Sequence, residues 1–378
     1  MRASPKRILI YRLGSLGDTI VTLPALRVVA NAFPESKRWM LTNFSVSVKA
    51  VPAAQVLRNT GLIQGYIEYP IGLRDPGALM ELRKRIRSLH PEVLVYLATP
   101  RGRGRILRDA LFFKLCGIKQ LIGVPYTPSL QSSAAMDNGI YEYEGARLLR
   151  CIQSLGTIPL EDPSAFDLCL TSSEHSAAGA ALNGLGKSRP FIVACVGAKV
   201  DVKDWGNTNW AQLLSKLGKT LNGWDLAMIG SADEAERSSQ LLRQWSGDSR
   251  NLCGQLSVRE SAAMLSRSEA YIGHDSGPMH LAAAVGTLYV AIFSSRNLPG
   301  EWFPPGSQHR ILYKTVGCMG CRRDVCEERN KTCIRSISVD EVFGHVMRIL
   351  APERHRVSNK RLDRCGHENK GTLSAGLG

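Results

Sequence analysis

The chain lacks any long apolar run. Hydrophobic residues make up 44% of its 378 residues, yet no stretch approaches the 18 or more that a membrane span requires. Near the N-terminus, Arg2, Lys6 and Arg7 precede an apolar stretch of only four residues, 8–11. That stretch is too short for a secretory signal peptide. We therefore expect the protein to stay in the cytoplasm.

Acidic residues are scarce relative to basic ones. The chain has 33 Asp and Glu against 48 Lys and Arg, a net charge of +15. The tail from Pro352 holds six Lys/Arg and three Asp/Glu, so +12 belongs to the remainder. Such a charge favours an anionic partner, and the alternative is a solvated basic surface with no special partner. Nucleic acid is disfavoured because zinc fingers, aromatic RNA-binding signatures and a helix-turn-helix are all missing.

Strand and helix patterns alternate twice along the chain, which is long enough for two domains. Apolar strand candidates in the first half lie at 7–13, 39–43, 66–69, 92–98 and 121–124, with helical patterns at 78–89, 104–115 and 145–155. A polar passage at 171–189 predicts a helix and then a linker. Further strands are predicted at 191–196, 225–229, 251–253, 270–273, 288–293 and 310–313, with helices at 209–217 and 258–266. This pattern is typical of parallel sheets covered by helices on both faces.

An anion-binding turn is predicted at residues 272–286, which read IGHDSGPMHLAAAVG. The apolar run indicates a strand, Pro278 the first turn of a short helix, and Gly286 its end. The start of such a helix presents free N–H groups and partial positive charge, and phosphate is its usual ligand. The alternative is an ordinary strand–turn–helix joint in which Asp275 or Ser276 only caps the helix.

A second glycine turn lies near the N-terminus, where residues 7–18 read RILIYRLGSLGD. The pattern predicts a strand, a glycine loop and an acid, Asp18. The loop is not G-x-G-x-x-G, so the dinucleotide fingerprint is absent. An acid at the carboxyl end of a sheet strand is placed to accept a proton from an attacking hydroxyl. The alternative role for Asp18 is that of a helix cap.

Together the two turns resemble the motifs of glycosyltransferase family 9, the ADP-heptose:lipopolysaccharide heptosyltransferases. That family shows R-L-x-x-x-G-D-x-x-x-x-L-P-A-L near its N-terminus and N-D-S-G-P-x-H-L-A-A-A-x-G in its second half; His274 replaces the usual Asn. The resemblance implies an α/β GT-B fold, two Rossmann-like domains with parallel sheets facing a central cleft. We expect an acceptor-binding domain at 1–170, a nucleotide-sugar-binding domain at 171–350 and a disordered basic tail at 351–378.

The resemblance also assigns roles to single residues. It implies that Asp18 is the catalytic base and that Lys203 meets the diphosphate of the donor. Cys195 and Val196 stand where the family usually has His and Pro, so the loop before Lys203 departs from the pattern. The remaining implied site residues are Gly14 and Gly17 on the acceptor side, and Glu234, Asp275, Ser276, Gly277, Pro278 and His280 on the donor side. The alternatives are a helix-dipole role for Glu234 in the first turn of a helix and a structural role for His280.

The function implied by the resemblance is inverting transfer of heptose from ADP-heptose to the lipopolysaccharide inner core, with no cofactor required. The partners would be an ADP-sugar and an anionic lipid-linked glycan, with peripheral contact at the cytoplasmic face of the inner membrane. A basic run, Arg101 to Arg105, followed by Leu111, Phe112 and Phe113 suits such contact; a buried helix with a basic cap is the alternative. Two other functions stay open: a sugar-nucleotide epimerase or hydrolase, and a non-catalytic glycan- or nucleotide-sugar-binding protein.

Four of the ten cysteines cluster near the C-terminus. Cys318, Cys321, Cys326 and Cys333 have the spacing C-x2-C-x4-C-x6-C. In a reducing compartment, where disulfides are disfavoured, four thiolates suit a structural zinc ion. The second spacing is not a standard zinc pattern, so free thiols are the alternative. Any metal here would be structural rather than catalytic.

Overall fold

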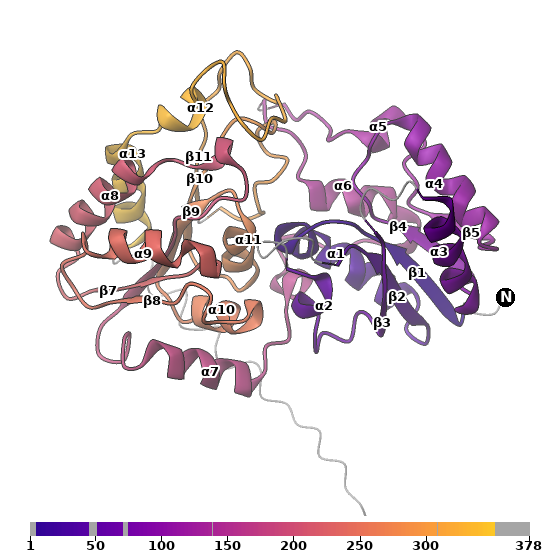
Figure 1. Cartoon of the computed structure of the whole chain (residues 1–378), viewed down its shortest axis with the longest axis horizontal. Coiled ribbons are helices and arrows are strands. Elements are labelled where there is room, and N and C mark those ends of the chain that lie inside the picture. Colours follow the sequence, from indigo (N-terminus) through magenta and orange to yellow (C-terminus); the bar gives the residue numbers. More distant parts are fainter. Residues whose placement is uncertain (1–4, 45–50, 71–74, 138, 308, 352–378) are drawn as a thin grey trace, which may run out of the picture.

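Two parallel sheets lie side by side in the computed structural model, each at the centre of one half of the chain (Figure 1). The structure describes residues 5–44, 51–70, 75–137, 139–307 and 309–351. The predicted disordered tail lies, apart from its first residue, outside this range. No helix within the described ranges is long and apolar enough to cross a membrane.

The first sheet has five strands in the order β3-β2-β1-β4-β5. They are β1 (Arg7–Tyr11), β2 (Lys37–Thr42), β3 (Gly65–Glu68), β4 (Val93–Tyr96) and β5 (Gln120–Ile122). The helices of this half are α1 (Leu16–Ala32), α2 (Ala53–Val56), α3 (Pro76–Ser88), α4 (Arg103–Leu115), α5 (Pro128–Gln131) and α6 (Glu144–Cys151), followed by the 3-10 turns η1 (Gln153–Leu155) and η2 (Pro163–Phe166). Buried side chains of α3 and α4 pack on one face of the sheet, and those of α1 and α6 on the other.

The second sheet has six strands in the order β11-β10-β9-β6-β7-β8. They are β6 (Phe191–Cys195), β7 (Asp225–Met228), β8 (Ser249–Asn251), β9 (Ala270–His274), β10 (Tyr289–Ile292) and β11 (Arg310–Leu312). Around them lie α7 (Ser172–Leu182), α8 (Asn207–Thr220), α9 (Ala235–Leu242), α10 (Val258–Leu265), α11 (Gly277–Ala284), α12 (Thr332–Arg335) and α13 (Val339–Ile349), with short turns η3 (Asp201–Lys203) and η4 (Ala232–Glu234).

Both sheets are doubly wound, and the strand order reverses at one point in each. The reversal lies between β1 and β4 in the first sheet and between β6 and β9 in the second. Ligands of such sheets bind beyond the carboxyl ends of the strands at the reversal. The loops that follow these four strands are therefore the segments in which to look for a site.

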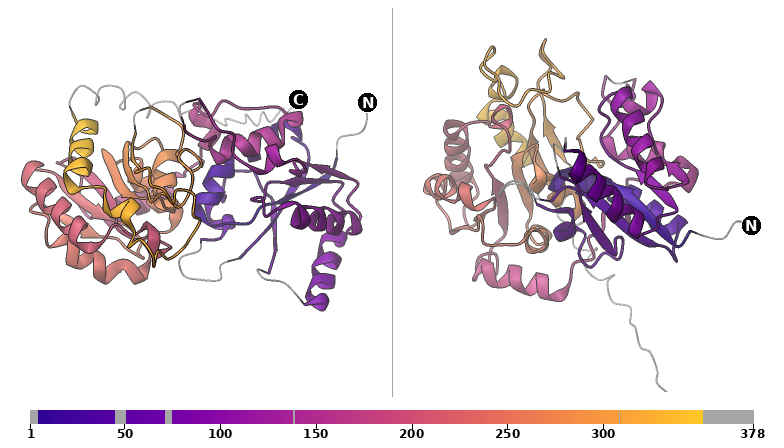
Figure 2. Two further views of the ribbon diagram at one scale, coloured as in Figure 1. Left: turned by 90° about the horizontal axis from the view of Figure 1, so that it is seen from above. Right: turned by 45° about the vertical axis from the view of Figure 1, so that its right-hand side comes forward.

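The two halves meet where α1 and α11 pack against each other, in the middle of the molecule (Figures 1 and 2). Glycines permit this close approach. A Cβ atom on Gly17 would lie 2.9 Å from Cδ2 of His280, and one on Gly277 would lie 2.8 Å from Leu16. One continuous apolar cluster extends from the first sheet through these helices to the second.

Arg259 of α10 adds a buried polar link between the halves. It is only 3% exposed. Its Nη1 donates to the carbonyl oxygens of Leu168 at 2.8 Å and Val56 at 3.1 Å, and its Nη2 donates to Cys169 at 2.9 Å. The guanidinium also pairs with the Glu174 carboxylate at 2.5 Å. A single side chain thus ties α10 to α2 and to the segment that leads into α7.

The predicted alternation of strands and helices is confirmed. Each of the eleven expected strands is present, with ends that differ from the expected ones by a few residues. The expected helix at 145–155 is divided into α6 and the 3-10 turn η1. The two parallel sheets confirm the predicted α/β class, whereas the residue at which one domain gives way to the next stays a prediction.

Candidate active site

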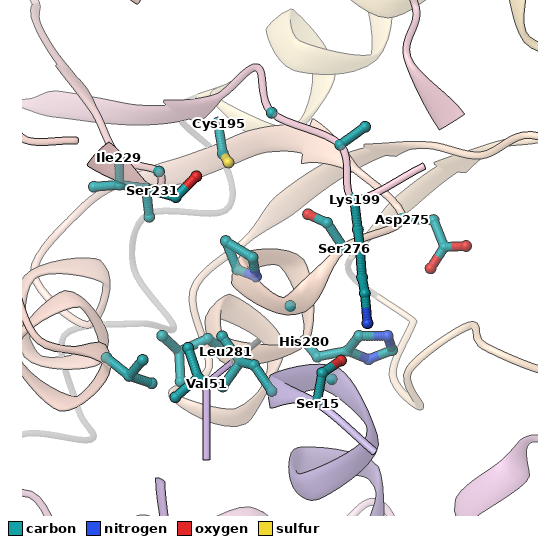
Figure 3. Close-up of a pocket in the computed structure, with 18 of the residues that line it drawn as sticks. Ser15, Val51, Cys195, Lys199, Ile229, Ser231, Asp275, Ser276, His280 and Leu281 are labelled. Carbon is teal, nitrogen blue, oxygen red and sulfur yellow. The ribbon is translucent and has the colours of Figure 1, made fainter. Parts of the chain in front are cut away.

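A cavity of about 710 Å³ opens between the two halves, at the carboxyl ends of both sheets. The first half contributes the start of α1 and Thr99, which follows β4. The second half contributes the loops after β6, β7, β9 and β10 and the start of α10. Segments next to both points of strand reversal therefore line one cavity, part of which is drawn in Figure 3.

Asp18 lines this cavity from the first turn of α1. Its Oδ2 accepts a hydrogen bond from the Ser15 amide at 2.9 Å, the reciprocal arrangement of a capping box. Its Oδ1 lies 3.3 Å from Nη2 of Arg12, which is 2% exposed. The Asp18 side chain keeps 26% of its surface exposed. It therefore caps the helix and also presents a carboxylate to the cavity.

Two contacts fix the loop that carries Asp18. Arg12 donates to the carbonyl oxygens of Leu97 at 2.8 Å and Asp18 at 3.0 Å, so it joins β4 to α1. Asn43, just after β2, accepts from the Gly14 amide at 2.7 Å and donates to the Gly14 carbonyl oxygen at 3.0 Å. A Cβ on Gly14 would lie 2.3 Å from that of Asp18. Gly14 therefore lies behind the acid, whereas Gly17 faces the cavity.

Lys203 faces the cavity from the second half and forms an ion pair with Asp275. Its Nζ lies 2.6 Å from Oδ2 of Asp275 and donates to the Asp275 carbonyl oxygen at 3.0 Å. The side chains are 15% and 3% exposed, respectively. The pair joins the loop after β6 to the turn after β9. The predicted base Asp18 and the predicted donor lysine thus line the same cavity, although they are 185 positions apart in the sequence.

Glu234 lies between the turns that follow β6 and β7. A Cβ on Gly197 would come within 2.0 Å of its Oε1, and a Cβ on Gly230 within 2.3 Å of its Oε2. Oε2 also accepts from the Ser231 amide at 3.0 Å. Only glycine leaves room at both turns. The carboxylate is thus held at the carboxyl edge of the sheet, where ribose hydroxyls bind in related folds.

The turn after β9 places the start of α11 against the cavity. Ser276 is the N-cap, and Gly277 and Pro278 are the first two helical residues. Gly286, just past the helix, adopts φ +76°, as expected for a glycine that ends a helix. All three residues at the helix start line the cavity, as does His280. The predicted strand, turn and short helix are therefore confirmed.

His280 is buried and lies against the first half. Burial lowers its pKa to about 4, the Lys203 charge acts in the same direction, and Asp275 and Asp18 oppose it. The ring is therefore neutral at pH 7. It stacks edge-on against Trp302, with 6.0 Å between the ring centroids.

His274 occupies the motif position at which family 9 usually has Asn. It is part of the core rather than of the cavity lining. It is fully buried, and burial lowers its pKa to about 4. Nδ1 lies 3.1 Å from the Gly197 carbonyl oxygen, to which it donates, because Nε2 accepts from the Trp205 amide at 3.2 Å and from Trp210 Nε1 at 3.3 Å. The ring holds the β6 and β9 turns in register.

The sequence analysis missed several residues of the cavity. Lys199 follows β6, and in Figure 3 its side chain extends toward His280. It has no ion-pair partner in the part of the chain that the structure describes. The sequence signal that could have identified Lys199 is its position two residues after Gly197, in the turn that follows β6. Val51 and Gln55, around the start of α2, bring the first half to the same cavity, and no local motif marks them.

The predicted zinc site is not formed. No group of three or more metal-ligating side chains occurs in the described ranges. Cys333 is buried on α12 against the apolar core of the second sheet, whereas Cys321 is exposed, so the thiols lie in different environments. All four cysteines of the cluster are free thiols in this structure.

Two facing doubly wound sheets with one shared cavity define the GT-B architecture, a fold of enzymes that use nucleotide sugars. A model of glycosyltransferase family 9 (heptosyltransferase) matches residues 147–332. The matched segment holds 186 of the 378 residues, and over this segment the chain is similar to glycosyltransferase family 9.

Individual proteins of this family are similar to the chain as well. Lipopolysaccharide heptosyltransferase 2 of Salmonella typhimurium is 29% identical over 175 residues, which are 45% of this chain and 49% of that protein. The chain thus matches about half the length of this curated relative. Among solved structures, a family 9 glycosyltransferase from Veillonella parvula superposes with a TM-score of 0.70 at 19% identity, over 93% of this chain and 98% of the other. E. coli ADP-heptose LPS heptosyltransferase II gives 0.64 at 18% identity, over 91% and 98%.

Proposed function

We propose that the protein is an inverting glycosyltransferase that moves heptose from ADP-heptose to the inner core of lipopolysaccharide. The observation that carries the proposal is the shared cavity. One acid, Asp18, enters it from the first half, and cations with a helix start enter it from the second. The donor and acceptor classes are those printed in the names of similar proteins, lipopolysaccharide heptosyltransferase 2 and ADP-heptose LPS heptosyltransferase II.

The donor would lie along the second sheet. Glu234 is suited to accept hydrogen bonds from ribose hydroxyls, and the start of α11 to meet the diphosphate. Lys203 is neutralised in part by Asp275, so Lys199 supplies positive charge that no described acid offsets. As the bond from the anomeric carbon to the diphosphate oxygen breaks, these groups would stabilise the charge that develops on ADP.

The acceptor hydroxyl would approach from the first half. Asp18 takes its proton while the oxygen attacks the anomeric carbon of heptose, so one bond forms as the bond to ADP breaks. Attack on the face opposite the leaving group inverts the configuration at that carbon. Arg12 and the Ser15 amide orient the carboxylate for this step.

The direct test is incubation with ADP-heptose and truncated core glycolipids, followed by mass spectrometry of the products. We expect one heptose to be added and ADP to be released. Release of free sugar without an acceptor would instead favour an epimerase or hydrolase. Tight donor binding with no turnover in the presence of every core glycolipid would favour a binding protein.

Replacing Lys203 should weaken donor binding. We expect Lys203→Ala to raise the dissociation constant for ADP by the equivalent of about 1–3 kcal/mol, because a charge-assisted contact is lost. Isothermal titration calorimetry measures this directly. Lys216→Ala is the matched control, because Lys216 lies on α8 outside the cavity and pairs with exposed Asp340. Equal ADP affinity in the Lys203 variant and wild type would remove this residue from the donor site.

Acceptor binding should depend on salt more strongly than donor binding. Lys84 and Arg85 of α3 and Arg103 and Arg105 of α4 are exposed cations of the first half. Salt screens exposed charges beyond about 8 Å at physiological ionic strength. We expect the apparent KM for a deacylated, phosphorylated core acceptor to rise with salt, and ADP affinity to change less because its contacts are enclosed. Equal responses, or equal use of a neutral glycan, would contradict an anionic acceptor.

A further inference from the structure

Helix α4 presents an apolar stripe to solvent. Its inner face is formed by Ile106, Ala110 and Phe113, which pack in the core of the first sheet. On the outer face, Leu107, Leu111 and Leu115 are 59%, 61% and 55% exposed. They are spaced four residues apart and therefore lie one above another along the helix. Of the apolar residues expected to suit membrane contact, Leu111 is exposed, whereas Phe113 is buried and does not belong to this surface.

Basic residues flank this stripe on both sides. At 100° per residue, Arg103 and Lys114 lie on one side of the leucines and Arg105 and Arg108 on the other. The one acid of the helix, Asp109, is buried, and its Oδ1 forms an ion pair with Nη2 of Arg108 at 2.8 Å. The outer face of α4 therefore combines apolar and positively charged groups and carries no exposed carboxylate.

Helix α3 extends the surface. Nε of Arg83 on α3 donates to the carbonyl oxygen of Leu115, the last residue of α4, at 3.0 Å. Met80 of α3 is 69% exposed, and Lys84, one turn further on, is exposed as well. Figures 1 and 2 show α3 and α4 at the end of the first half that is remote from the second sheet.

We propose that the outer face of α4, extended by Met80 and Lys84 of α3, docks on the surface of an anionic lipid bilayer. An apolar stripe flanked by Arg and Lys suits a helix that lies in the interface, with leucines among the acyl chains and cations at the phosphates. A second copy of the chain fits poorly, because its own basic flanks would face these with like charge.

The position of α4 connects this surface to the cavity. Thr99 lines the cavity, and the helix begins at Arg103, only four residues later. The 13 residues of α4 span about 20 Å. A lipid-linked acceptor held in the bilayer would thus lie at the end of the helix that leads to the cavity. The inference goes beyond the proposed reaction, which a soluble acceptor could also undergo.

The test is sedimentation of the full chain with vesicles, without any substrate. One set is pure phosphatidylcholine and the other contains about one third phosphatidylglycerol. We expect binding to the anionic vesicles that weakens with salt, and little binding to the neutral ones. Leu107→Ser/Leu111→Ser should lower partitioning on anionic vesicles at least about tenfold, because two leucines no longer enter the apolar layer. Arg103→Glu/Arg105→Glu should abolish the preference for anionic lipid.

The control is Met136→Ser/Val325→Ser, which changes two side chains that are each 55% exposed and lie outside α3 and α4. Its vesicle binding should equal that of wild type, and ADP affinity should be unchanged in all three variants. Absence of wild-type binding, or unchanged binding of the leucine variant, would overturn the proposal. So would concentration-dependent dimerisation that the leucine variant loses. None of these readouts involves heptose transfer. Failure of the vesicle experiment would therefore leave the proposed reaction untouched, and the transfer assay tests that reaction independently.

Discussion

Asp18→Asn should reduce turnover by about 100-fold or more and leave ADP affinity nearly unchanged. The amide fills the same space and can still accept from the Ser15 amide, but it does not take a proton from the acceptor hydroxyl. Product formation with ADP-heptose and a core glycolipid measures turnover, and calorimetry measures ADP binding. A fall in kcat at constant ADP affinity indicates loss of an interaction made in the transition state.

Glu341→Gln provides the matched control for this variant. Glu341 closes the capping box of α13 with Ser338 and pairs with Lys314, as Asp18 does with Ser15 and Arg12, yet it lies outside the cavity. It should leave turnover unchanged. Near-normal turnover of Asp18→Asn would show that Asp18 only caps α1, which was the alternative role at the level of sequence.

The protein should lose stability steeply as the pH falls from about 6.5 to about 4. His274 and His280 are buried, and their pKa values are lowered from 6.5 to about 4. Between these values the unfolded chain binds protons that the folded chain excludes, so the free energy of unfolding falls as the pH falls. Each of these two histidines should lower the free energy of unfolding by about 2 kcal/mol between pH 7 and pH 5.

Urea unfolding at pH 7 and pH 5 tests this expectation on His274→Asn. The variant removes one titrating group from the core, so its stability should fall by about 2 kcal/mol less than that of wild type over this interval. His90→Asn is the control, because His90 is exposed and its φ of +47° suits asparagine. A pH dependence identical in wild type and His274→Asn would show that His274 does not titrate between the folded and unfolded states.

The sequence determined the strands and the two glycine turns, and the motifs of these turns resemble those of glycosyltransferase family 9. Apolar runs between glycine or polar breaks predict buried parallel strands, because only a sheet covered on both faces buries every side chain of a run. Asp275 and Ser276 were found because they come directly after an apolar strand, and Asp18 because it closes the glycine loop after β1. Local order therefore placed all three near the carboxyl edge of a sheet.

Only the tertiary structure decided which of these groups share a cavity. The pairing of Lys203 with Asp275, the support of Gly14 by Asn43 and the contact of Gly17 with His280 join residues that are 72, 29 and 263 positions apart. No local pattern encodes such distances. The apolar stripe of α4 and the unequal burial of Cys321 and Cys333 were also decided by tertiary packing, because which side of a helix or loop is buried depends on the elements that pack against it.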